Sequence, residues 1–102
     1  MGRSEQNIQL EEQLQRLKLP GYPLGDPLAI GIICFIAEGS PKDVPDILMI
    51  GRMQGFIPFE ASNRDVMLTL HMLIDFNWLA FTTTRLVKAG PRVEELYTKQ
   101  NK

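Results

Sequence analysis

The stretch of sequence that most constrains the fold is NRDVMLTLHMLIDFNWLAFTTTRLVKAGPRVEELY, which runs from Asn63 to Tyr97. Its first part has apolar residues three and four positions apart as far as Asp75, which predicts an amphipathic helix with one buried face and with Arg64, Leu68, His71 and Asp75 on the opposite side. Two short segments suited to strands follow, Trp78–Phe81 and Arg85–Lys88, and a run of threonines lies between them. Gly90 and Pro91 then end the hairpin and begin a polar amphipathic helix. This order predicts a mostly helical α+β domain with one short β-hairpin.

Two further helices are predicted upstream of this stretch. The run LAIGIICFIA, Leu28–Ala37, is apolar on nearly every face, so it belongs at the centre of the fold. Asp26 and Pro27 supply the start of this helix, and Gly39 supplies its left-handed end. A helix over about Val44–Gln54 is favoured next because leucine and methionine dominate it, and Gly55 is expected to stop it. Its ILMI segment is also compatible with a buried strand, since periodicity cannot separate short apolar runs.

The N-terminal segment Ser4–Lys18 predicts a helix with a narrow apolar stripe made of Leu10, Leu14 and Leu17. Such a stripe must be buried against another surface, and two surfaces fit equally well: the chain's own domain, or the same helix of a second copy. We predict a homodimer in which these three leucines contribute to the interface. Three prolines and two glycines between residues 19 and 27 predict a turn-rich connector. The predicted organisation is therefore a helix over 1–19, a linker over 20–27 and one domain over 28–102.

The charge of the chain is balanced in total and uneven along its length. The 102 residues include 11 basic and 12 acidic side chains, a formal net charge of −1. Residues 26–75 carry three basic and seven acidic side chains, whereas residues 76–102 carry five and two. Affinity for phosphate is therefore expected in the last quarter, and the net charge argues against strong non-specific binding of DNA.

The single cysteine and the apolar runs bear on the compartment of the protein. Cys34 is the only cysteine, so no intramolecular disulfide can form, and its apolar neighbours predict a core position. The apolar run that contains it is about half the length needed to cross a bilayer. The first residues, MGRSEQNIQLEEQL, lack the apolar region of a secretory signal. We expect a cytoplasmic protein with no membrane association.

The sequence contains no pattern typical of catalysis or metal binding. One histidine and one cysteine provide no ligand cluster with zinc spacing, and nucleotide-binding and nucleophile motifs are missing. His71 is the sole candidate base, without a serine or cysteine at a recognisable spacing. A histidine without such partners is more often a surface or satisfied core residue. We therefore expect neither an enzyme nor a bound metal or cofactor.

The order helix, helix, helix, short hairpin, helix over Asp26–Tyr97 resembles the winged helix-turn-helix superfamily. FNWLAF and TTTRLVKAGPRVEELY stand where that family has its wing and final helix, with Leu86 and Gly90 matching its Leu and Gly positions. Two features depart from the pattern: Val87 replaces the threonine that commonly caps the last helix, and FNWL lacks the usual glycine. The resemblance implies a mostly helical winged helix-turn-helix with an extra N-terminal helix.

The resemblance also implies a DNA-binding transcriptional regulator. The segment Asn63–Asp75 would be the recognition helix, entering the major groove with its N-terminal residues leading. Arg64 would contact a guanine edge or a phosphate, and the wing tip would contact phosphate or the minor groove. The implied DNA-binding residues are Asn63, Arg64, Thr83, Thr84, Arg85, Lys88 and Arg92.

A protein-interaction or assembly module without DNA binding is the alternative prediction. Arg64 is the only basic residue of the predicted recognition helix apart from the neutral His71, and Leu68 and Met72 add apolar surface to its outer side. Exposed apolar residues at that place indicate a protein interface. The threonine run is equally explained by β-propensity at a hairpin. A third interpretation is a small accessory subunit whose apolar outer surface is buried by a larger partner.

Overall fold

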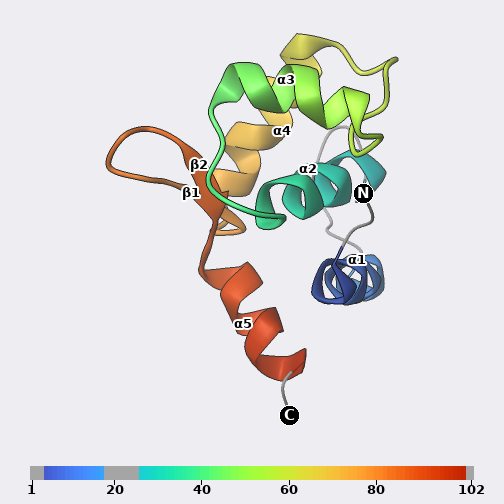
Figure 1. The fold of residues 1–102 in the computed structure, drawn as a ribbon, viewed down its shortest axis with the longest axis vertical. Coiled ribbons are helices and arrows are strands. Elements are labelled where there is room, and N and C mark those ends of the chain that lie inside the picture. The colour runs from blue at the N-terminus through green and yellow to red at the C-terminus, as the bar shows by residue number, and fades with distance from the viewer. Residues whose placement is uncertain (1–3, 18–25, 101–102) are drawn as a thin grey trace.

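The computed structural model describes residues 4–17 and 26–100, and in these residues it forms five helices and one two-stranded antiparallel hairpin (Figure 1). The predicted α+β class, mostly helical with a short hairpin, is confirmed at this level. The first six residues of the linker predicted at 20–27 lie outside the described residues, and its last two belong to a helix. The elements are α1 (Glu5–Leu17), α2 (Asp26–Ala37), α3 (Val44–Met53), α4 (Asn63–Asp75), β1 (Leu79–Phe81), β2 (Val87–Ala89) and α5 (Pro91–Gln100).

Helix α2 is the centre of the fold, as its apolar composition predicts. Every residue from Leu28 to Ile36 is buried except Gly31, and α2 packs against α1, α3, α4 and β2 (Figure 1). The segment ILMI forms part of helix α3, so the alternative interpretation of a buried strand is wrong. Gly51 of α3 allows a close approach, because a Cβ there would lie 2.8 Å from the Cδ1 atom of Ile57. The close neighbours of Gly51 are thus Ile57, in the loop after α3, and Phe35 of α2.

Helix α1 packs on α2 and α5 of its own chain. Leu10 and Leu14 are fully buried there, whereas Leu17 is half exposed. The Asn7 side chain donates a hydrogen bond of 2.8 Å to the carbonyl oxygen of Cys34, near the end of α2 where helical carbonyls lack intrahelical partners. Leu10 and Leu14 therefore belong to the core of one chain and do not offer a free surface to a second copy. Their assignment to a dimer interface is corrected in favour of the intrachain alternative.

The ends of α3 and α4 follow capping chemistry. Asp43 and Ser62 cap the N-termini, each accepting a hydrogen bond of 3.0 Å from the backbone N–H three residues ahead. Gly55, with φ of 83°, ends α3 as predicted. Asn77 ends α4 in the same left-handed conformation, with φ of 69°, and the next N–H, that of Trp78, donates to Leu73 at 2.9 Å. Asparagine thus takes the place of the glycine that the segment FNWL lacks.

The hairpin is shorter than predicted, because Trp78 and the turn residues Thr82–Leu86 are used for other hydrogen bonds. Trp78 completes the end of α4, so β1 begins at Leu79 and pairs with β2 in the register Leu79 to Ala89. Lys42, between α2 and α3, adds one antiparallel bridge to Val87, which attaches this connection to β2. Gly90 is needed at the base of the hairpin, since a Cβ there would lie 2.6 Å from the Asn77 carbonyl oxygen.

Candidate functional site on α4 and the hairpin loop

The outer face of α4 is exposed as the periodicity predicts. Its inner face is buried, with Val66, Leu70 and Leu73 fully covered and Met67 and Ile74 partly covered. The predicted outer residues Arg64, Leu68, His71 and Asp75 are all exposed. The structure therefore confirms which side of this helix faces the core and which side is free in a single chain.

Three apolar side chains, four positions apart, follow this outer side and are here named the α4 stripe: Leu68, Met72 and Phe76. The exposed fraction is 47% for Leu68 and 51% for Phe76, and Met72 is partly exposed between them. Residues four apart lie on neighbouring turns of one helix face, so the three form a continuous strip. Phe76 is the residue that caps the C-terminus of α4. Periodicity over the helix alone does not identify it, because it lies past the last helical residue.

The hairpin loop, Thr82–Leu86, is held by its own hydrogen bonds. The N–H of Arg85 donates to the Thr82 carbonyl oxygen at 3.0 Å, and the N–H of Thr82 donates to Leu86 at 2.8 Å. The Thr82 hydroxyl accepts from the N–H of Leu86 at 3.0 Å and lies 3.0 Å from the Thr84 hydroxyl. Two of the three threonine hydroxyls therefore stabilise the turn, while Thr83 is exposed beside them.

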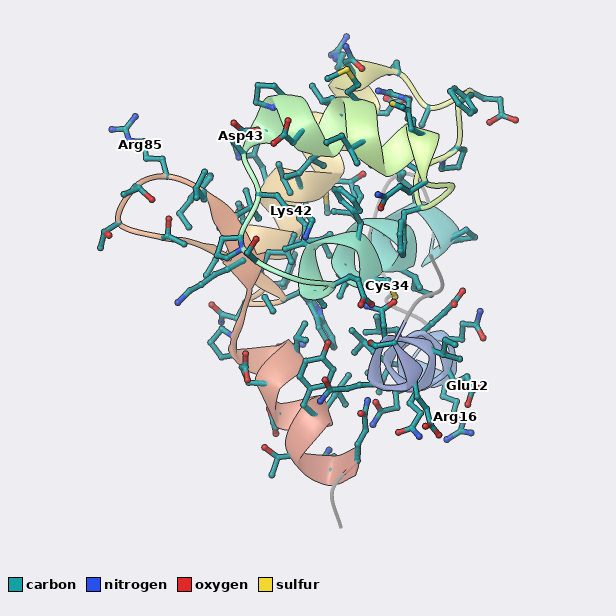
Figure 2. All side chains as sticks on the ribbon, in the orientation of Figure 1. Glu12, Arg16, Cys34, Lys42, Asp43 and Arg85 are labelled. Atoms are coloured by element: carbon teal, nitrogen blue, oxygen red, sulfur yellow. The ribbon has the colours of Figure 1, made fainter. Side chains whose placement is uncertain are left out.

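Arg85 occupies the position of this loop that requires a left-handed backbone, with φ of 64°. Three-residue hairpin loops place a residue there that is usually glycine. An arginine at this position costs about 1–2 kcal/mol relative to a relaxed backbone. Figure 2 shows its side chain at the tip of the loop, directed away from the helices. The sequence does not reveal the left-handed backbone at Arg85, because the neighbouring residues are equally compatible with a regular β-strand.

The basic residues proposed to contact DNA do not gather on one element. Arg64 lies at the start of α4, and Arg85 lies at the hairpin tip. The guanidinium carbon of Arg92 lies 5.5 Å from the centre of the Trp78 ring, just beyond the other end of α4. The 13 residues of α4 span about 20 Å, so these cations are distributed over a wide surface. Asn63 and Lys88 are exposed as well.

Lys88 belongs to a cleft of about 550 Å³ between the hairpin, the end of α2 and α5. Glu94 and Tyr97 also line this cleft. Burial, and secondarily the nearby Cys34 and Glu38, raises the pKa of the Tyr97 phenol. Lys88 is exposed and lines this cleft together with Glu94.

A second cleft of about 810 Å³ lies beside Lys42. The Lys42 ammonium donates to the carbonyl oxygens of Glu38 and Ser40 and lies 5.0 Å from the centre of the Phe35 ring. Desolvation lowers the pKa of Lys42, and the nearby Glu38 carboxylate opposes this shift. Lys42, which sequence reasoning did not single out, thus joins the α2–α3 connection to the core.

The described residues hold no group of three histidine, cysteine or acidic side chains placed to bind a metal ion. Cys34 is buried beside α1 (Figure 2), as its apolar neighbours predict, and His71 is exposed on α4. Within residues 4–17 and 26–100, no helix is both long and apolar enough to cross a membrane. The arrangement that remains as a candidate site is a surface, composed of the α4 stripe and the hairpin loop.

Comparison with known proteins gives no relative of this chain. No family model matches it, and no curated protein or solved structure gives a match either.

Proposed function

We propose that residues 26–100 form a winged-helix module that acts in protein interaction or assembly through the α4 stripe. The order α2, α3, α4, hairpin, α5 supports the winged-helix assignment, since it is the order that the resemblance implies. The bridge between Lys42 and Val87 supports it further, because it attaches the connection before α3 to the hairpin. This module would use the outer face of α4 as its contact surface.

The observation that carries this proposal is the half-exposed apolar surface of Leu68 and Phe76 on the outer side of α4. Burying a whole leucine or phenylalanine side chain contributes about 1.5–3 kcal/mol, so covering the exposed halves contributes about 1 kcal/mol each. Contiguous apolar residues on a surface with polar surroundings are typical of protein interfaces. Arg64 and His71 alone give this face little attraction for a phosphate backbone.

Site-specific photo-crosslinking in the native host tests this function. A photo-reactive amino acid replaces Leu68 in one variant and the exposed Arg16 of α1 in a matched control. We expect position 68 to give a discrete crosslinked product that position 16 does not give. Equal products from both positions, or none from position 68, would contradict an interaction surface on α4.

DNA binding in transcriptional regulation is the second candidate, and the strained arginine at the hairpin tip favours it. A cation kept at a position better suited to glycine indicates that its side chain is used. Arg85 could meet a phosphate or the minor groove without any contribution from α4. Electrophoretic titration with a mixed-sequence duplex at low salt tests this candidate. Retention of the duplex by the wild type and a weaker affinity of Arg85→Ala, with Arg16→Ala unchanged, would support it, whereas no retention at low salt would exclude it.

A further inference from the structure

Side chains of opposite charge stand on the outer face of α4 before and after Leu68 and Met72 of the α4 stripe. Arg64 lies at the N-terminal end of the outer face and Asp75 at its C-terminal end, and both are exposed. They are about three helical turns apart, which places them on the same face of the helix. Leu68 and His71 lie between them on this face, at equal distances along the chain from the two charges. The outer face of α4 therefore carries Arg64 near its N-terminal end and Asp75 near its C-terminal end, with Leu68 and the polar His71 between them.

This order is complementary to itself when a second α4 is laid antiparallel. A twofold axis through the middle of the helix would bring Arg64 of each copy to Asp75 of the other. Leu68 of each copy would meet the turn formed by His71 and Met72 of the other. A parallel pair would instead place equal charges together at both ends, which is unfavourable. The charge order thus selects one geometry, an isologous contact in which the same surface serves both copies.

We propose that the α4 stripe is the interface of a twofold homodimer with antiparallel α4 helices. The inference rests on the proposed interaction function and names its partner, a second copy of this chain. It also places the predicted homodimer on a different element, because Leu10 and Leu14 are buried within one chain. In this dimer Arg64 is paired, so DNA would be left to the hairpin tips. The contact formed by one helix is small, which predicts weak, concentration-dependent association.

Sedimentation equilibrium of the full chain, from low to high micromolar concentration, tests the dimer. We expect the apparent mass to rise from 11.6 kDa toward twice that value. Leu68→Arg should weaken association by at least about tenfold, because each dimer loses two apolar contacts and gains two buried charges. Met53→Arg on α3 is the matched control, since Met53 is more exposed at 73% and lies outside the α4 stripe. It should leave association unchanged.

Charge exchange tests the antiparallel geometry. Arg64→Asp and Asp75→Arg should each weaken association by about tenfold, because each creates two like-charge contacts in the dimer. The double variant exchanges both partners and should restore association. Circular dichroism melting of each variant shows whether it is folded, and both positions are exposed, so folding should be retained. Failure of the double variant to restore association, with folded single variants that are weakened, would overturn this geometry.

The homodimer and the interaction function fail in different ways. A chain that stays monomeric at every concentration overturns the homodimer. If position 68 then still crosslinks to a different protein, the interaction function stands with another partner. If position 68 gives no product, the interaction function fails as well. A dimer that is weakened equally by Leu68→Arg and Met53→Arg would also overturn the assignment to α4.

Discussion

Arg85 and Asn77 are the two residues other than glycine with a positive φ in the described part of the chain. Asparagine tolerates this conformation because its short polar side chain can bond locally, whereas arginine gains nothing comparable. Asn77 has a clear structural role at the end of α4. Arg85 has no such role in the described part of the fold. We therefore attribute the choice of arginine at this position to function rather than to stability.

Arg85→Gly should raise the free energy of unfolding by about 1 kcal/mol, because glycine adopts the left-handed backbone without strain. The greater freedom of glycine in the unfolded chain offsets part of this gain. Urea denaturation followed by circular dichroism measures the change, and Lys88→Gly, in strand β2, is a control that should destabilise. A loss of stability in Arg85→Gly would show that the arginine side chain holds the loop.

Thr69 is fully buried on α4, and its hydroxyl has no hydrogen-bond partner among the described residues. Thr69→Val keeps the shape and removes the buried hydroxyl, so the free energy of unfolding should rise by about 1 kcal/mol or more. Thr98→Val on α5 is the control, because this exposed hydroxyl donates to the Glu94 carbonyl oxygen at 3.1 Å. It should change stability by less than about 0.5 kcal/mol. Destabilisation by Thr69→Val in thermal melting would reveal a partner for the hydroxyl.

Among the elements, α1 is attached by Leu10, Leu14 and the buried hydrogen bond from Asn7, and also by the hydrogen bond from Gln13 to the Leu96 carbonyl oxygen of α5. Asn7→Ala removes the donor to the Cys34 carbonyl oxygen and leaves space in a buried site. We expect a loss of about 2–3 kcal/mol in the free energy of unfolding. Gln9→Ala, at an exposed position of the same helix, should have little effect. Equal effects of the two substitutions would mean that α1 is not held to α2 by Asn7.

The elements that the sequence predicts well are those whose limits are set by local chemistry. Asp43, Ser62 and Gly55 bound α3 and α4 through caps that can be recognised in sequence. The strands were placed one or two residues early, because the N–H of Trp78 is used by the end of α4 and Arg85 turns left-handed. These strand boundaries depend on contacts between elements, and the local sequence pattern does not show such contacts.

The packing of α1 shows the same limit of prediction from sequence. Its leucine stripe indicates that a cover is needed, yet the stripe is equally compatible with a second copy and with the chain's own core. For α4, periodicity correctly placed Arg64, Leu68, His71 and Asp75 outside. It did not show that Phe76 extends the apolar strip, because that residue lies beyond the periodic helix.

On the scale of the whole molecule, the scattered cations limit how DNA could be held. Arg64, Arg85, Lys88 and Arg92 are the exposed candidates, and pairing of Arg64 in a dimer would remove one of them. The slope of log affinity against log salt should therefore be shallow, about −3 for each chain that engages DNA. Fluorescence anisotropy at several salt concentrations measures this slope. A slope of about −6 or steeper for one chain would require a basic surface that this fold does not present.

In the proposed function, a protein covers the outer face of α4. Hydroxyl-radical footprinting in the native host, read by mass spectrometry, measures this cover at Met72, with Met53 of α3 as an internal reference. We predict that Met72 is oxidised more slowly in the cell than in dilute purified protein, while Met53 reacts at a rate that changes little. Equal rates for Met72 in the cell and in dilute solution, relative to Met53, would contradict the proposed function.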